Sequence, residues 1–152
     1  MKGWEEMSKY PSEEWLKKYY PVSAEEIVKD KNISTKQLVL HSIQKWEGLY
    51  LRNRKPYGIG ISGIFNTLID ENLDEVLRMG CESCTLCLRF HWMWAGSKEA
   101  GICEDCPITL ATGSPCDVGD SNPWRIWANY HNPTPMLTAL KKALVYCEEN
   151  GI

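Results

Sequence analysis

The sequence predicts an α+β fold that is mainly helical and forms a single domain around a β-hairpin module. Three observations lead to this prediction. A chain of 152 residues with 43% hydrophobic and 24% charged residues has the size and composition of one globular domain. Apolar residues recur at helical spacing in its first half and again near its end. Between these stretches, an alternating aromatic run stands between two pairs of cysteines.

Residues 1–33 are predicted to be an N-terminal extension with short helices. Residues 12–15 (Ser-Glu-Glu-Trp) are typical of a helix start, and residues 23–26 (Ser-Ala-Glu-Glu) have the pattern of a capping box. A third start opens the clearest helix of this half, which we expect over about residues 34–51. Its apolar residues keep helical spacing: Leu38, Val39, Ile43, Trp46, Leu49 and Tyr50.

Residues 34–79 are predicted to be helical overall, with one interruption. The glycines at positions 58, 60 and 63 mark turns and leave room for a short strand within residues 52–65. Residues 66–79 are expected to return to a helix. The buried stripe of that helix is expected to be Leu68, Ile69, Leu73, Val76 and Leu77.

Charge is unevenly distributed along the chain. Residues 31–56 carry six basic side chains and one acidic side chain, although the formal net charge of the whole chain is −3. Two interpretations stay open: a solvated basic face, or an anion-facing patch formed by Arg52, Arg54 and Lys55. The acidic balance of the chain disfavours a general nucleic-acid-binding protein.

The end of the chain predicts a helix over residues 134–150. Thr134 is expected as its N-cap, with Pro135 at the first helical position and Gly151 as its C-terminal stop. The apolar stripe is Leu137, Leu140, Leu144 and Cys147. Because Cys147 belongs to this stripe, we interpret it as a small buried hydrophobic residue.

The strongest chemical signal is a cluster of six cysteines in the middle of the chain. Cys84 and Cys87 have two residues between them, Cys103 and Cys106 repeat that spacing, and fifteen residues separate the two pairs. This spacing matches a four-thiolate zinc site, since two intervening residues let a tight turn aim both sulfurs at one ion. We therefore predict that these four cysteines bind Zn²⁺ in a closed, structural site.

The choice of ligands and cofactor stays open at this point. Cys81 can replace a member of the first pair, and Cys116 a member of the second. Six cysteines for four positions also leave an iron–sulfur cluster as an alternative cofactor. A further alternative is thiol redox chemistry with His91 or His131 as the base.

The residues between the two pairs predict a hairpin. Residues 88–94 alternate between apolar and polar side chains, which is typical of a strand, and residues 95–98 resemble a turn. Two cysteine turns joined by a hairpin make a zinc-ribbon-like β-hairpin module, expected over residues 81–127.

The tryptophans have two interpretations. Trp124 and Trp127 are expected on a short helix after Pro123, packing over the metal site together with Phe90, Trp92 and Trp94. Alternatively, they form a stacking platform for a small nucleotide whose phosphates meet basic side chains. The candidate ligand-binding residues of this alternative are Arg52, Arg54, Lys55, Arg89, Trp92, Trp124 and Trp127.

The order of these motifs resembles a group of small cysteine-rich bacteriophage and prophage proteins. The matching segments lie within about residues 40–147, and they are Ser-Ile-Gln-Lys-Trp-Glu-Gly-Leu at 42–49, the two cysteine pairs followed by Pro107, Thr-Gly-x-x-Cys at 112–116, Ser-Asn-Pro-Trp at 121–124 and Pro-Met-Leu-x-Ala-Leu at 135–140. The resemblance implies a phage or prophage context and a metal-binding centre. The resemblance does not imply any particular activity. Cys81 falls outside the shared pattern, which favours the pair of Cys84 and Cys87.

These observations together predict a function. The start of the sequence shows no secretory signal and no apolar run long enough to span a membrane, so we expect a cytoplasmic chain, in the host cell if it is phage-encoded. Thiols stay reduced there. We predict a zinc-stabilised, non-enzymatic accessory protein that binds a host or phage macromolecule, with a protein partner favoured over extended nucleic acid. The alternative hypothesis is a nucleotide-binding or nucleotide-processing protein. The third hypothesis is an iron–sulfur or thiol redox protein.

Overall fold

The computed structural model is mainly helical and contains one small antiparallel sheet, consistent with the predicted α+β class. It describes residues 11–63, 66–80, 83–90, 105–117 and 122–152. Within these ranges the helices are α2 (Pro11–Tyr19), α3 (Ala24–Lys29), α4 (Thr35–Glu47), α5 (Leu51–Arg54), the 3₁₀ helix η1 (Lys55–Tyr57), α6 (Thr85–Phe90), α8 (Pro107–Thr112), α9 (Pro123–Tyr130) and α10 (Thr134–Asn150). The strands are β1 (Gly60–Ile61), β2 (Leu68–Ile69) and β3 (Glu75–Leu77).

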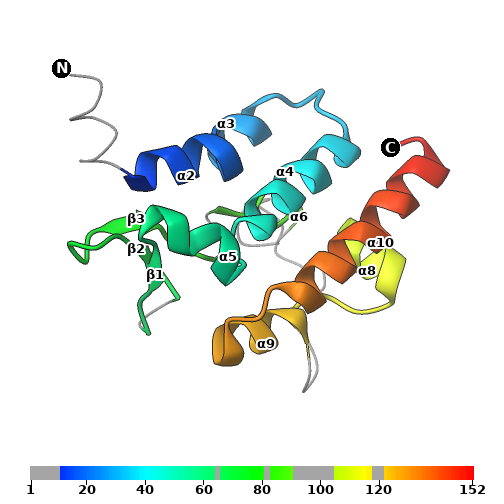
Figure 1. The fold of residues 1–152 in the computed structure, drawn as a ribbon. Helices are drawn as coiled ribbons and strands as arrows, with labels where there is room; N and C mark the ends of the chain where they lie inside the picture. The colour runs from blue at the N-terminus through cyan, green and yellow to red at the C-terminus, as the bar shows by residue number, and fades with distance from the viewer. Residues whose placement is uncertain (1–10, 64–65, 81–82, 91–104, 118–121) are drawn as a thin grey trace.

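The core is built around α4 and α10. Helix α10 packs against α4, α8 and α9, while α6 packs against α3 and α4 (Figure 1). The largest buried side chains include Trp15 from α2, Trp127 from α9, and Leu38 from α4. In Figure 1 the sheet lies on the opposite side of the molecule from α10. None of the helices in the described ranges is both long and apolar enough to cross a membrane.

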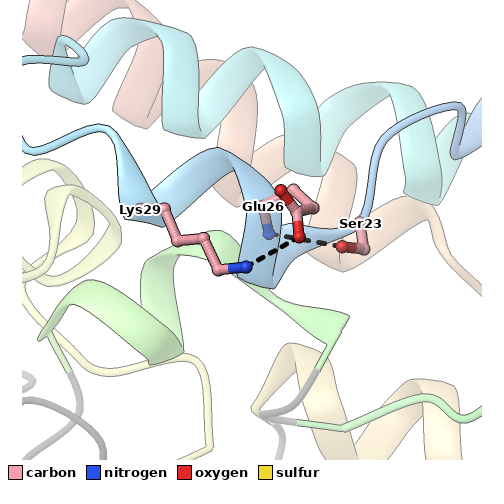
Figure 2. Close-up of polar contacts among 3 residues, drawn as sticks. All are labelled: Ser23, Glu26 and Lys29. Atoms are coloured by element: carbon pink, nitrogen blue, oxygen red, sulfur yellow. Dashed lines mark hydrogen bonds and ion pairs between the residues drawn. The ribbon is translucent and has the colours of Figure 1, made fainter.

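Helix starts in the N-terminal half follow the sequence prediction. The hydroxyl of Ser23 accepts a hydrogen bond from the backbone N–H of Glu26 at the start of α3, and Lys29 pairs with the Glu26 carboxylate at 2.8 Å (Figure 2). Ser34 caps α4 in the same way, by accepting from the N–H of Gln37. The serine N-caps of both predicted helix starts are confirmed, because each serine oxygen replaces a missing acceptor of the first helical turn.

Helix α4 ends earlier than predicted. It stops at Glu47, and α5 starts again at Leu51, so the expected helix over 34–51 is interrupted. Gly48 lies at the break against α2, where a Cβ atom would stand 2.5 Å from Cγ of Tyr19. The indole of Trp15 donates a hydrogen bond to the Gly48 carbonyl at 2.9 Å. The close approach of α2 therefore accompanies the end of the helix.

The prediction of a helix over residues 66–79 is wrong. Strands β2 and β3 pair there in an antiparallel hairpin, and β1 pairs with the other edge of β2. The carboxylate of Asp70 accepts the backbone N–H groups of Asn72 and Asp74, and Leu73 adopts a left-handed backbone with φ of 65°. This turn breaks the apparent helical stripe into two strands, and it leaves Leu73 75% exposed at the tip.

The prediction of a strand starting at residue 88 is also wrong over residues 88–90, the part of it that the structure describes. Residues 88–90 belong to α6, in which Leu86 and Phe90 stand four residues apart and line the same cavity. Residues 91–104, the rest of the expected hairpin, lie outside the described residues. The zinc-ribbon-like hairpin therefore stays a prediction, and its described flanks are helical.

The C-terminal helix is confirmed with a shifted start. Thr134 is already helical, so the N-cap position falls to Pro133 and not to Thr134. Gly151 ends α10 with a left-handed backbone, as expected. Cys147 is 1% exposed in the core, which confirms its interpretation as a buried hydrophobic residue.

Candidate metal centre

The four clustered cysteines that the structure describes all line one cavity. Its volume is about 190 Å³, and its lining includes Cys84, Cys87, Cys106 and Cys116. These residues come from three segments: the start of α6, the residue before α8, and the loop that leads to α9. The fold therefore brings together side chains that are up to thirty-two positions apart in the sequence.

Each cysteine is held by the backbone around it. The N–H of Cys87 donates to Sγ of Cys84 at 3.4 Å, so the turn at the start of α6 points donors toward that sulfur. Cys106 is the N-cap residue of α8, with Pro107 at the first helical position. The carbonyl of Cys116 accepts the N–H of Trp124 at 3.1 Å, which ties this loop to the start of α9.

The environment of Cys84 favours its thiolate. A hydrogen bond from the Cys87 side chain is the main cause that lowers the pKa of Cys84 to about 5, and the charge of Lys45 and backbone N–H groups of Cys87 and Leu86 act in the same direction. Burial opposes them. The thiolate is the form of cysteine that binds metals.

Lys45 is a residue of the cavity that the sequence interpretation did not single out. It is only 1% exposed, and its Nζ donates to the Ser83 carbonyl at 2.7 Å and to the Ser83 hydroxyl at 3.4 Å. It lines the cavity beside the cysteines. The signal was present in the sequence, since Lys45 stands seven residues after Leu38 and four before Leu49 and so falls on the buried stripe of α4.

Helices α4 and α6 are joined next to this lysine. The Thr85 hydroxyl is buried and donates to the Leu38 carbonyl at 2.7 Å, and it lies 3.2 Å from the Ser42 hydroxyl. These contacts fix the start of α6, and with it the first cysteine pair, against α4.

The other walls of the cavity are mostly apolar. Buried residues from α6, α8 and α10 contribute Leu86, Ile108, Met136 and Leu140. Trp124 and Phe90 also line the cavity, as the packing interpretation of the aromatic residues expected. Trp124 and Trp127 both contact Trp46 edge-on, with ring centroids 6.3 and 5.4 Å away.

The described residues do not form a compact ion-binding group. Within the part of the chain that the structure describes, no three His, Cys, Asp or Glu side chains stand close enough together to hold an ion directly. No disulfide joins the five described cysteines. Cys81 and Cys103, the latter one of the four predicted zinc ligands, lie outside the described residues.

Most of the described residues in the predicted ligand-binding set do not line the cysteine cavity. Arg54 is 8% exposed and donates to the carbonyls of Leu49 and Ile59, so it is a structural residue of the turn before β1. Arg52 lies over the Tyr50 ring at 4.2 Å, and Lys55 is exposed in η1.

Two further members of this set have structural positions. Arg89 donates to the carbonyls of Val28 and Asp30, joining α6 to the end of α3. Trp127 is fully buried, and Trp92 lies outside the described residues. Of the set, only Trp124 lines the cysteine cavity in the described ranges.

Comparison with known proteins adds no assignment. No protein-family model matches the chain, and neither a curated protein nor a solved structure matches it. The features of the described structure that bear on function are therefore the cysteine-lined cavity and the buried Lys45 beside it.

Proposed function

We propose that the protein is a metal–thiolate protein whose centre is bound by Cys84, Cys87, Cys106 and Cys116. The supporting observation is that these four side chains, from three separate segments, line one cavity. Cysteines that serve only as hydrophobic residues pack singly in the core, as Cys147 does. Thiolate sulfur selects zinc or iron–sulfur clusters among the common protein metals.

The charge of Lys45 supports this proposal. A buried ammonium group is costly unless a negative charge lies near it. Four thiolates around a metal leave a net negative charge on the centre, and Lys45 lies on the same cavity wall. A negatively charged centre would therefore compensate the cost of burying the Lys45 ammonium group.

We further propose that the centre has a structural role in a non-enzymatic accessory protein. Its ligands join the start of α6 to the loops before α8 and α9, so the metal replaces part of a hydrophobic core as a cross-link. The phage context and the macromolecular partner follow from the resemblance of residues 40–147 to small phage proteins. A protein partner is favoured over a nucleotide, because Arg54, Arg89 and Trp127 of the nucleotide alternative are engaged in structural contacts.

Metal analysis of the full chain tests the proposal. After anaerobic purification from cells grown with both zinc and iron, we expect the wild type to carry a stoichiometric metal. The Cys84→Ser variant should lose most of it, and the Cys147→Ser variant, which makes the same change away from the cavity, should keep it. A folded wild-type chain without zinc or iron contradicts the proposal.

A further inference from the structure

We infer that the outer face of α10 binds a second copy of the same chain, with the two α10 helices antiparallel around a two-fold axis near Val145. This face borders a groove between α8 and α10, whose lining includes Leu110, Lys142, Val145 and Glu149. The residues of the groove all belong to described helices, and none of them lines the cysteine cavity. The inference is therefore independent of the proposed metal centre.

Apolar side chains are exposed on both sides of this groove. Leu110 of α8 is 46% exposed, and Val145 of α10 is 52% exposed. Helices α8 and α10 pack against each other (Figure 1), so the two apolar side chains flank one groove. Covering them with a partner removes apolar surface from water, which favours association.

The groove-lining residues of α10 include one straight stripe. Thr138, Lys142, Val145 and Glu149 follow one another at spacings of four, three and four positions. Residues at this spacing lie on one side of a helix, and alternating steps of three and four positions are typical of a seam between two helices. The stripe is therefore suited to a second helix that lies along α10.

The charges of the stripe are complementary to themselves. Lys142 precedes Val145 by three positions, and Glu149 follows it by four. In an antiparallel pair centred near Val145, Lys142 of each copy lies opposite Glu149 of the other, and the two-fold axis makes this pair occur twice. A parallel pair would place each of these charges opposite its own kind, which repels. The charge pattern therefore selects the antiparallel arrangement.

Both charged groups are exposed at the surface of the single chain. Within the described ranges, neither Lys142 nor Glu149 takes part in an ion pair. The neighbouring Lys141 differs, because its Nζ lies 3.7 Å from a carboxylate oxygen of Glu47 in α4. A uniformly acidic partner would attract Lys142 but repel Glu149, whereas a second copy presents the opposite charge to each.

Sedimentation of the full chain and of its charge-reversal variants tests the inference. We expect the wild type to move from 17.4 kDa towards twice that mass as its concentration rises. Lys142→Glu and Glu149→Lys should each raise the dissociation constant of the dimer by at least about tenfold, because each change places like charges opposite one another twice. Lys31→Glu makes the same change at an exposed lysine outside the groove and should leave the constant unchanged.

Recombining the two reversals tests the antiparallel arrangement. The chain that carries both changes should regain the dimer, and so should an equimolar mixture of the two single variants, since each restores opposite charges across the axis. A wild type that stays monomeric at every concentration overturns the inference, and the groove then serves a different partner. A dimer that neither reversal weakens, or that the combined changes do not restore, overturns the antiparallel pairing of α10.

Discussion

Lys45 is the residue whose charge most directly affects the proposed centre. Its ammonium group is held by Ser83 on the wall of the cysteine cavity, and nearly all of the side chain is buried. In Lys45→Met, an apolar side chain of similar length replaces the charge beside the thiolates. We expect the metal affinity to fall by about 10–100-fold, as for other residues that support metal ligands. Competition with a chelator measures this change.

The exposed Lys142 provides the control for Lys45. It lies on α10 and is not part of the cavity lining, so Lys142→Met removes one positive charge from the surface alone. Equal metal retention by Lys45→Met, Lys142→Met and the wild type would show that the buried charge does not act on the centre.

His41 makes the stability of the fold depend on pH. Burial is the main cause that lowers its pKa, and the charge of Lys45 lowers it further, while the hydrogen bond to Val22 and the charge of Cys84 raise it. Its Nε2 lies 2.7 Å from the Val22 carbonyl, and Nδ1 is buried with no partner in the described residues. The neutral ring, donating from Nε2, is thus the form that fits.

Because the folded pKa of His41 is below the unfolded value of about 6.5, the unfolded chain binds the proton more readily. Stability is therefore present above about pH 6.5 and is lost as the pH falls below it, by at most about 1.4 kcal/mol per pH unit. Urea unfolding from about pH 8 to about pH 5 measures this slope. The His41→Gln variant should show a smaller slope, and an unchanged slope would contradict the assignment to His41.

At the scale of elements, the junction of α2 and α4 depends on the absence of a side chain at Gly48. Its backbone has an ordinary φ of −69°, so the constraint is space and not conformation. In Gly48→Ala the new methyl group collides with Tyr19 and Trp15. We expect a loss of about 1–3 kcal/mol in the free energy of unfolding. Gly63→Ala, whose Cβ meets nothing within 4 Å, should change it far less; equal effects would argue against the packing described.

The sequence predicts elements well where one local signal dominates. Ser23 and Ser34 start helices because a hydroxyl caps the first turn, and the stripe of α10 is long enough to exclude other periods. It fails where the same spacing fits two structures. Residues 66–79 show a helical stripe, but the turn closed by Asp70 makes them a hairpin. That turn is decided by backbone hydrogen bonds that the apolar pattern does not encode.

The candidate site, like the secondary structure, was predicted where the sequence carries a local signal and missed where it depends on packing. The paired spacing of Cys84 and Cys87 indicates thiolate ligands, but which distant cysteine completes the set depends on how α8 and α9 pack. In the sequence interpretation, Lys45 was counted only among the six basic side chains of residues 31–56. Its position on the apolar stripe of α4 was the better guide.

At the scale of the whole molecule, the proposed centre would join the start of α6 to the segments that precede α8 and α9. Trp124 lines its cavity and contacts Trp46 in α4. Removal of the metal with EDTA and a mild oxidant should therefore lower the melting temperature and alter the tryptophan fluorescence. The Cys84→Ser variant, which lacks a complete centre, should not respond. A wild type that keeps its melting temperature after full metal loss would exclude a structural role.

The position of α10 also orders the events of biosynthesis. This helix follows all four cysteines in the chain, yet its Met136 and Leu140 form part of the cavity wall. On a ribosome, the four thiols emerge before the helix that covers them. The nascent chain thus passes through an open stage in which a cofactor can be delivered without unfolding anything. Once α10 has docked, Met136 and Leu140 cover part of the cavity, so we expect the proposed centre to load more readily before that step.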